Sequence, residues 1–235
     1  GMVTVFTPAY NSKKTIERLY NSLLSQTNSN FEWVVVNDGS TDSSGTLCDS
    51  FAAEHEYAKV LHQENMGLSE ARNQGVKISS GDYVTFIDSD DLVVPNYLEY
   101  LYNLVQKYGT EVSVGCARLF WNDVCPSTPE PEGSDRLLSA EEMLEGICYA
   151  RLPIFACGKL YKRYLVEQFP HPKGELYEDT ATTHKIIGAI DKVAYGTQKI
   201  YYWRQRSGSI THSVITERHY YGITASINQL NYMKE

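Results

Sequence analysis

The sequence predicts an α/β protein with a mostly parallel central sheet and helices on both faces. Short apolar, β-branched segments alternate with segments of helical periodicity from the first residues to about residue 110. This alternation is typical of parallel strands joined by crossover helices. The 235 residues are 42% hydrophobic and 21% charged, as in an ordinary globular protein. This length suits one large α/β domain, or one domain with a small appendage.

Five segments in the first half are predicted strands, because they are apolar and rich in β-branched or aromatic residues. They cover residues 2–7, 31–36, 59–61, 83–87 and 111–120. The first helix is expected to have Asn11 or Ser12 as its N-cap. Its apolar residues have the spacing of a helix with one buried face, and they are Ile16, Leu19, Tyr20, Leu23 and Leu24. Further helices are expected at about 43–55, from Ser69 onward, and around Leu98, Leu101, Tyr102 and Val105.

The sequence of the second half predicts a smaller region that mixes helices and short strands. Residues 122–134 contain three prolines and are expected to form an exposed loop. Ser139 and Glu142 have the spacing of a capping box, which predicts a short helix. The remainder is expected to contain a helix at 180–190, short strands at 193–195 and 200–204, and a helix after Thr216.

Composition excludes several classes of protein. The net charge of −8 argues against nucleic acid as a partner, because binding a phosphate backbone needs clustered Lys and Arg. The five cysteines show no C-x-x-C spacing, which favours free thiols in a reduced, intracellular setting. No run approaches the roughly 18 apolar residues of a membrane span. No signal peptide is expected, and Gly1 before Met2 resembles a cloning scar. A membrane anchor or a further domain beyond Glu235 stays open.

The most informative segment ends in the carboxylates Asp88, Asp90 and Asp91. They follow the predicted strand at 83–87, and ligands of open α/β sheets bind at the carboxyl ends of strands. Alternate residues of an extended segment share a face, so Asp88 and Asp90 are expected to point at one object. Mg²⁺ and similar cations bind carboxylates together with substrate phosphates. The segment predicts a metal-assisted site for a phosphorylated ligand, although a polar turn with a helix cap near Pro95 gives the same pattern.

Two earlier strand ends carry polar residues that suit a nucleotide. Tyr10, beside Asn11, offers a ring for stacking on a base. The carboxylate of Asp38 is suited to accept a hydrogen bond from a base N–H, although Asp38 and Gly39 alone also suit a simple turn. Arg72 has three open interpretations: an ion pair with Asp38, a contact with the nucleotide, or a solvated helix charge. The P-loop and dinucleotide-binding motifs are missing from the sequence, so those two hypotheses lose their main support.

Glu178 and Asp179 precede the helix predicted at 180–190. Asp179 would be an ordinary N-cap. A carboxylate aimed into a cleft would also act as a general base that removes a proton from a hydroxyl. Adjacent side chains diverge, so only one of the pair is expected to face the reacting atom, and we favour Asp179.

A second polar cluster follows the last predicted strand. Arg204 and Arg206 carry guanidinium groups suited to phosphate oxygens, and the hydroxyls of Ser207 and Ser209 would donate to the same oxygens. His212 is a candidate to complete a metal shell, since imidazole suits Mn²⁺ better than Mg²⁺. The aromatic residues just before this cluster are interpreted as core or as a wall of the acceptor site.

Taken together, these motifs resemble glycosyltransferase family 2, the inverting nucleotide-sugar transferases with the A-type glycosyltransferase fold. That fold is Rossmann-like, with a mostly parallel sheet between helices. The resemblance covers nearly the whole chain. The matching segments are T-P-A-Y-N at 7–11, V-N-D-G-S-T-D at 36–42, N-x-G at 65–67, A-R-N at 71–73, D-S-D-D at 88–91, G-K-L-Y-K-R at 158–163 and E-D at 178–179.

The resemblance implies a role for each matching residue. The nucleotide-sugar, usually a uridine derivative, would be held by Pro8, Tyr10, Asn11, Asp38, Gly67, Arg72, Asp88, Ser89, Arg204, Arg206, Ser207 and Ser209. Mn²⁺ or Mg²⁺ would be bound by Asp90 and Asp88, with His212 as a further candidate. Asp179, with Glu178 beside it, would supply the catalytic base. Residues 1–121 would form the nucleotide-sugar-binding half, and 122–235 the acceptor-binding and catalytic-base half of the same domain.

The implied activity is transfer of a hexosyl or N-acetylhexosaminyl group to a hydroxyl of a saccharide or lipid-linked acceptor. Its setting would be capsule, cell-wall or related polysaccharide assembly at the cytoplasmic face of a bacterial membrane. Residues 203–205 do not reproduce the Q-x-x-R-W motif of some polysaccharide synthases, which counts against a processive synthase. Two alternatives stay open. A nucleotidyltransferase would need a glycine-rich, basic loop where residues 8–11 stand, and a sugar-nucleotide-binding protein would bind the donor without turnover.

Overall fold

The computed structural model describes residues 1–121, 123, 133–149, 151–153, 155–173 and 178–205, with only the backbone of 178–181. The strands are β1 (Val3–Ala9), β2 (Phe31–Asp38), β3 (Ala58–Gln63), β4 (Tyr83–Phe86), β5 (Leu92–Val93), β6 (Val112–Trp121), β7 (Asp135–Ser139), β8 (Lys159–Lys162) and β9 (Lys192–Gln205). The helices are α1 (Ile16–Leu24), α2 (Ser44–Glu54), α3 (Leu68–Ile78), α4 (Tyr97–Tyr108), α5 (Ala140–Cys148), α6 (Arg163–Gln168) and α7 (Glu178–Gly188).

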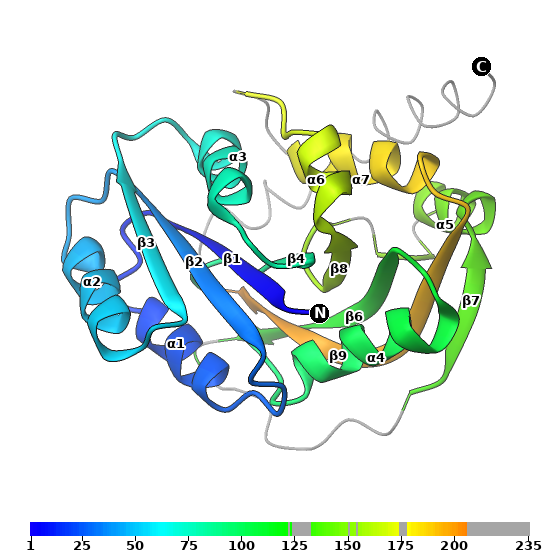
Figure 1. Cartoon of the computed structure of the whole chain (residues 1–235), viewed down its shortest axis with the longest axis horizontal. Helices are drawn as coiled ribbons and strands as arrows, with labels where there is room; N and C mark the ends of the chain where they lie inside the picture. The colour runs from blue at the N-terminus through cyan, green and yellow to red at the C-terminus, as the bar shows by residue number, and fades with distance from the viewer. Residues whose placement is uncertain (122, 124–132, 150, 154, 174–177, 206–235) are drawn as a thin grey trace.

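All these strands belong to one sheet in the order β3-β2-β1-β4-β8-β6-β9-β5, with β7 beside β9. Strands β1 to β4 run parallel, as do β6 and β9. Strands β8, β5 and β7 run antiparallel to their neighbours. The predicted fold class, a mostly parallel sheet between helices, is confirmed (Figure 1).

The sheet lies between two helical layers. Helices α1, α2 and α4 cover one face, and α3, α5, α6 and α7 cover the other (Figure 1). Successive residues of a strand point to opposite faces, so Val5 of β1 packs in the first layer and Phe6 in the second. Both side chains are fully buried, and burial of such a side chain stabilises the fold by about 1.5–3 kcal/mol.

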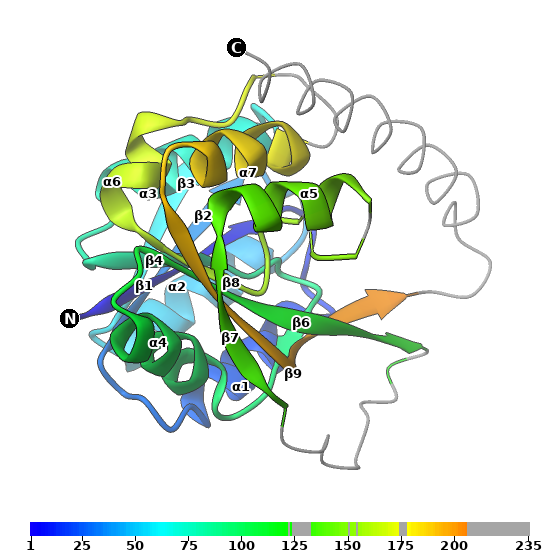
Figure 2. The same ribbon diagram turned by 90° about the vertical axis from the view of Figure 1, so that its right-hand side faces the viewer.

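The strands of the second half differ from the prediction. The two short strands expected at 193–195 and 200–204 are parts of the single strand β9, which lies beside β6 (Figure 2). The register between β6 and β9 shifts between Val114 and Ala117. Strands β5, β7 and β8 are not expected from the sequence. Strand β5 has only two residues, and β7 and β8 contain no β-branched residue, so none of them shows the apolar, β-branched run that identifies the strands of the first half.

Two helices of the first half begin at unexpected residues. Helix α1 has Thr15 as its N-cap, so the prediction of Asn11 or Ser12 is wrong. Asn11 has a φ of 47°, and the carbonyl of Ser12 accepts a hydrogen bond from the amide of Thr15, which closes a separate turn before the helix. Helix α3 begins at Leu68, after Gly67 with a φ of 92°, one residue before the predicted start.

Both helices predicted in the described part of the second half are present. Helix α5 begins with the expected capping box. The hydroxyl of Ser139 accepts from the amide of Glu142 at 3.1 Å, and the Glu142 carboxylate accepts from the amide of Ser139 at 3.3 Å. Helix α7 covers Glu178–Gly188 instead of 180–190.

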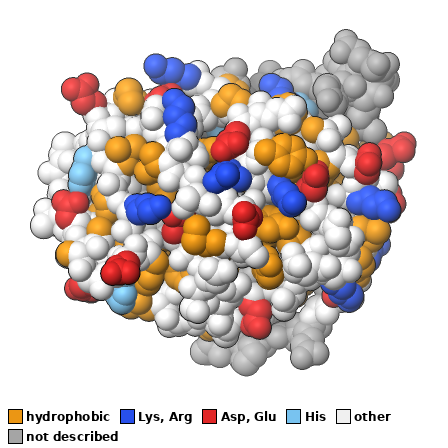
Figure 3. Space-filling model, viewed as in Figure 1, with side chains coloured by type: hydrophobic (Ala, Val, Ile, Leu, Met, Phe, Trp, Pro, Cys, Tyr) orange, Lys and Arg blue, Asp and Glu red, His pale blue; other side chains and the backbone are white. Residues whose placement is uncertain are grey.

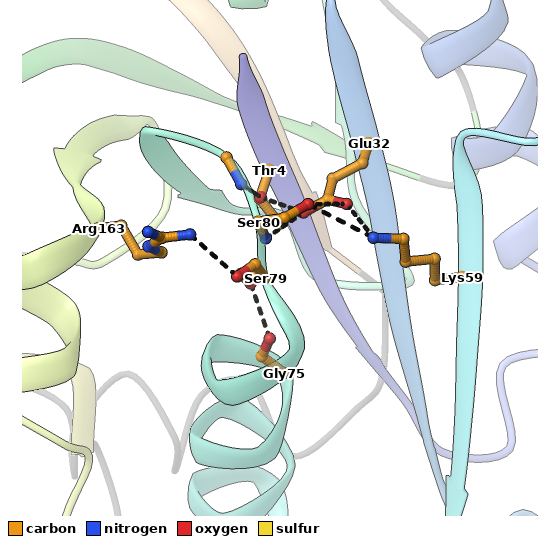
Figure 4. A network of polar contacts seen from close by, with 8 residues as sticks. Thr4, Glu32, Lys59, Gly75, Ser79, Ser80 and Arg163 are labelled. Carbon is orange, nitrogen blue, oxygen red and sulfur yellow. Dashed lines mark hydrogen bonds and ion pairs between the residues drawn. The ribbon is translucent and has the colours of Figure 1, made fainter. Parts of the chain in front are cut away.

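The amino ends of the parallel strands are tied together around Glu32 (Figure 4). Its carboxylate accepts hydrogen bonds from Thr4 at 2.7 Å and Lys59 at 2.6 Å, and from the amide and hydroxyl of Ser80 at 2.6 and 2.8 Å. Burial alone would raise the pKa of Glu32, but these hydrogen bonds outweigh burial and lower the pKa to about 2. The network closes one edge of the sheet, and the opposite edge carries the candidate site.

Acidic and basic side chains are interspersed on the face seen in Figure 3. None of the helices in the described part of the chain combines the length and hydrophobicity needed to cross a membrane. Among the described residues, Cys48, Cys116 and Cys157 carry free thiols.

Candidate active site

The turns after β1, β2 and β4 meet at the carboxyl edge of the sheet. The strands are aligned, because Phe6 of β1 pairs with both Val34 of β2 and Phe86 of β4. Side chains join the turns directly. The hydroxyls of Ser12 and Ser89 lie 2.6 Å apart. The expectation that these polar turns share one edge is therefore confirmed.

The first turn contributes Pro8, Tyr10 and Asn11. Pro8 is buried near the end of β1, whereas Tyr10 is 52% exposed. The amide of Asn11 donates to the Ser40 hydroxyl at 3.0 Å, and its side-chain oxygen accepts from the amide of Thr41 at 2.9 Å. Asn11 thus holds the first two turns together.

Asp38, at the end of β2, organises the loop before α3. Its carboxylate accepts from Gln63 and from the amide of Met66, both at 2.8 Å, and from the amide of Gly67 at 3.0 Å. These bonds place Gly67, with a φ of 92° that favours glycine, at the start of the helix. Asp38 is 5% exposed. Its role in the structure is to fix the loop that borders the candidate nucleotide site.

Arg72 lies under this edge and pairs with Asp88. Its side chain is 2% exposed, and its Nη2 lies 3.4 Å from Oδ1 of Asp88. The guanidinium carbon also lies 5.9 Å from the centroid of the Phe86 ring. Two of the three interpretations left open by the sequence, an ion pair with Asp38 and a solvated helix charge, are wrong. Arg72 instead holds the first carboxylate of the acidic segment.

The acidic turn, residues 88–91, places its carboxylates in different environments. Asp88 is partly exposed and Asp90 is exposed, so both reach the carboxyl edge. Asp91 is 2% exposed and points inward. Its carboxylate accepts from the Tyr201 hydroxyl at 2.5 Å and from the Arg204 amide at 3.0 Å. Burial, followed by the charges of Asp90 and Asp88, raises the pKa of Asp91 well above its usual value.

The sequence gives no signal for the inward position of Asp91 or for the partner Tyr201. Both follow from the pairing of β9 with the short strand β5, in which Tyr202 lies opposite Leu92. That pairing brings a segment more than a hundred residues away against the acidic turn. Asp91 is therefore part of the framework of the turn, whereas Asp88 and Asp90 lie at the surface of the carboxyl edge.

Arg204 also contacts the acidic turn. Its Nε donates to the carbonyl of Asp90 at 2.6 Å, and its guanidinium forms an ion pair with Asp123. The guanidinium carbon lies 4.7 Å from the centroid of the Phe120 ring, and the side chain is 2% exposed. Arg204 thus braces the turn from beneath. Its predicted contact with phosphate stays a prediction.

A pocket of about 60 Å³ opens beside the acidic turn. It is lined by Asp88, Asp91, Gly115, Cys116, Ala117, Pro153, Phe155, Cys157, Gly158, Tyr201 and Trp203. The rings of Phe155 and Trp203 lie 5.2 Å apart, and the Cys157 thiol lies 3.7 Å from Oδ2 of Asp88. Burial and then the Asp88 charge raise the pKa of Cys157 well above its usual value, so it stays a neutral thiol. The pocket thus has the Asp88 carboxylate on one side and the rings of Phe155 and Trp203 on another part of its wall.

Several predicted site residues cannot be placed. Glu178 and Asp179 form the first turn of α7, but their side chains lie outside the described part. Arg206, Ser207, Ser209 and His212 lie outside the described residues altogether. Among the described residues, no group of three or more His, Cys, Asp or Glu side chains is arranged to hold a metal ion. The carboxylates of Asp88 and Asp90 still fit such an ion, because Mg²⁺ commonly binds one or two carboxylates and completes its shell with phosphates and water.

Comparison with known proteins assigns the family. The sequence model of glycosyl transferase family 2 matches residues 4–129. The chain is 31% identical to glycosyltransferase GlyG of Streptococcus pneumoniae serotype 4, over 89% of this chain and 72% of GlyG. It is 34% identical to glycosyltransferase GlyA of the same organism, over 97% of this chain but only 34% of GlyA. This chain therefore belongs to glycosyltransferase family 2.

The fold has a close match among solved structures. Residues 1–349 of Staphylococcus aureus TarS, crystallised with UDP-GlcNAc, superpose with a TM-score of 0.75. The match covers 89% of this chain and 60% of the TarS chain, at 24% sequence identity. At this level of identity the match bears on the fold, which is that of the A-type glycosyltransferases. This chain spans about a third of the length of GlyA.

Proposed function

We propose that this protein is an inverting glycosyltransferase that moves a sugar from a nucleotide diphosphate, most simply UDP, to a hydroxyl of an acceptor. Family membership and the carboxyl edge of the sheet support this proposal. The observation that carries it is the acidic turn: Asp88 is held by buried Arg72 and faces the pocket, beside exposed Asp90. That arrangement suits a diphosphate at the edge with its sugar in the pocket.

The nucleoside would lie across the turns after β1 and β2. Tyr10 exposes its ring there, and Pro8, Asn11, Asp38 and Gly67 shape the rim. Uridine is a small pyrimidine, and TarS was crystallised with UDP-GlcNAc. A UDP-sugar is therefore the first donor to test.

The donor set at the acidic turn suits a divalent cation. Asp90 and Asp88 would bind Mn²⁺ or Mg²⁺, with His212 as a further candidate, and the cation would stabilise negative charge on the departing diphosphate. Arg72 holds Asp88 in place. Arg206, Ser207 and Ser209 would bind the phosphate oxygens, with Arg204, just before them in the chain, as a further candidate.

Asp179 is our candidate for the general base, with Glu178 beside it. It would take the proton of the acceptor hydroxyl as that oxygen attacks the anomeric carbon from the face opposite the diphosphate. One displacement inverts the configuration, and no covalent sugar–enzyme intermediate is needed. Residues 122–235 would contribute the acceptor side, and residues 1–121 the donor side. The acceptor would be a saccharide or a lipid-linked saccharide at the inner face of the cell membrane.

Release of UDP tests this proposal. The protein is incubated with Mn²⁺ and a panel of UDP-sugars that includes UDP-GlcNAc, with and without saccharide acceptors, and free UDP is measured. We expect turnover in the wild type, a loss of at least about a hundredfold in Asp179→Asn with donor binding retained, and weakened donor binding in Asp90→Ala. The same Asp90→Ala protein with unaltered turnover would contradict the metal assignment.

Other products would identify the alternatives. Formation of pyrophosphate from UTP and a sugar phosphate would indicate a nucleotidyltransferase. Binding of UDP-sugars without any release of UDP, across the whole acceptor panel, would indicate a binding protein. Weak donor binding in Asp179→Asn would show that Asp179 is a structural helix cap.

A further inference from the structure

A single buried hydroxyl connects the two ends of the acidic turn. The Tyr201 hydroxyl donates to Oδ2 of Asp91 at 2.5 Å and accepts from the amide of Asp88 at 3.1 Å. Tyr201 is 2% exposed. It comes from β9, in the second half of the chain, and its ring also lines the pocket. The first and last residues of the turn are therefore held by one atom that is not part of the turn.

The Asp91 carboxylate depends on Tyr201 for one of its hydrogen bonds. In the described part of the chain, the carboxylate of Asp91 is hydrogen-bonded by the Tyr201 hydroxyl and the Arg204 amide. Within the turn itself, the Asp91 amide donates to the Asp88 carbonyl at 3.1 Å. Without the phenol, the buried carboxylate and the Asp88 amide would each lose a partner, and a buried polar group without a partner is unfavourable. The turn would then rearrange to reach other partners or water.

We propose that Tyr201 is a positioning residue that fixes the spacing of the Asp88 and Asp90 carboxylates and so sets the affinity of the site for a divalent cation with UDP. This inference rests on the proposed function. Carboxylates that are already held in the geometry of the metal site bind a cation more tightly, because they lose little conformational entropy on binding. Tyr201 itself touches neither the cation nor the nucleotide in this proposal.

The chain offers a matched control in Tyr97. This residue is fully buried on α4, and its ring centroid lies 6.3 Å from that of Tyr201. Its hydroxyl is bonded to Thr85 at 2.6 Å, away from the acidic turn. Tyr97→Phe and Tyr201→Phe therefore remove the same atom from neighbouring buried sites, and only one of these atoms holds the turn.

The test measures Mn²⁺ binding in the presence of UDP, by the electron paramagnetic resonance signal of free Mn²⁺, together with thermal unfolding. We expect Tyr201→Phe to raise the Kd of Mn²⁺ about tenfold, the size of effect that a lost hydrogen bond to a charged group commonly has. Tyr97→Phe should change this Kd by less than about twofold while lowering the Tm. A purely structural role for Tyr201 would lower the Tm and leave the Kd unchanged.

Asp91→Asn provides a second test that does not depend on the stability of Tyr201→Phe. The side-chain oxygen of the new asparagine would accept from the backbone N–H of Arg204, and its NH₂ group would then face the Tyr201 hydroxyl. The Tyr201 hydroxyl therefore loses its acceptor at this position. We expect weaker Mn²⁺ binding in this variant, and no further loss when Tyr201→Phe is added. Unchanged Mn²⁺ binding in Asp91→Asn or in Tyr201→Phe, or equal weakening in Tyr97→Phe, overturns the inference. Failure of the wild type to bind Mn²⁺ and UDP overturns the proposed function instead.

Discussion

Two buried carboxylates show how the surroundings of a single residue decide its role. Glu32 and Asp91 are 4% and 2% exposed. Glu32 receives hydrogen bonds from the ammonium group of Lys59 and from Ser80, and its pKa falls to about 2. Asp91 is bonded to a phenol and an amide, and burial raises its pKa. The first stabilises the sheet, whereas the second shapes the candidate site.

Glu32 should make the stability of the protein depend on pH. A folded-state pKa of about 2, against an ordinary value of 4.5, stabilises the fold above pH 4.5, and this contribution is lost as the pH falls towards 2. Because the side chain of Lys59 is 48% exposed, solvent screening reduces the effect, and we expect about 2 kcal/mol. Urea unfolding of Glu32→Gln should show this deficit at pH 7 and a smaller one below pH 4.

The exposed residue Glu17 supplies the control for this prediction. Glu17 lies on the surface of α1, so Glu17→Gln should unfold within about 0.5 kcal/mol of the wild type at every pH. A deficit in Glu32→Gln that stays constant from pH 7 to pH 3 would show that Glu32 acts through packing and not through its charge.

At the scale of elements, α3 must lie close to β1 to present Arg72 under the acidic turn. The approach is possible because Gly75 has no side chain: a Cβ there would overlap the ring of Phe6. Phe6 is fully buried between the sheet and this helix. The sequence shows a glycine inside a predicted helix, but only the packing explains it.

Gly75→Ala should therefore destabilise the protein, although alanine is the better helix former. The gain in helix propensity is about 1 kcal/mol, and overpacking of a buried contact costs about 1–3 kcal/mol, so we expect a net loss on the order of 1 kcal/mol in urea unfolding. In the double variant Gly75→Ala, Phe6→Leu, the loss of unfolding free energy should be smaller than the sum of the losses in the two single variants. Strict additivity of the two changes would contradict the proposed overlap.

At the scale of the whole molecule, the two edges of the sheet have different tasks. The amino edge is closed by the Glu32 network, and the carboxyl edge carries the polar turns and the pocket. Strand β9 belongs to the second half of the chain, yet Tyr201 and Arg204 hold the acidic turn of the first half. Binding of a ligand at this turn should therefore stabilise both halves together.

Saturating UDP with Mn²⁺ should raise the Tm of the wild type by about 5–10 °C. A ligand at a hundred times its Kd stabilises the folded state by about 2.7 kcal/mol, and each 1 kcal/mol shifts the Tm of a protein of this size by about 2–4 °C. EDTA or Asp90→Ala should remove most of the shift. A shift that is the same in EDTA would show that UDP binds without a cation.

Much of the first half could be predicted from the sequence, because its strands are apolar, β-branched runs and its helices have apolar residues on one face. The alternation of apolar strands and one-sided helices predicts β1 to β4 and the meeting of their turns at one edge. The starts of α1 and α3 are less predictable, since a turn at Ser12 and a glycine at position 67 compete with the expected caps. The pairing of Arg72 with Asp88 in preference to Asp38 depends on which face of the helix is buried.

The order of strands and turns along the chain determines that polar residues collect at one edge. The residue types at that edge are the basis for the proposed site for a metal ion and a nucleotide diphosphate. The tertiary structure alone decides which of three neighbouring aspartates turns inward. Asp91 turns inward because it accepts hydrogen bonds from Tyr201 and Arg204, which are more than a hundred residues away in the chain. Local patterns contain no information about such partners, because pairing between distant strands depends on how the whole sheet packs.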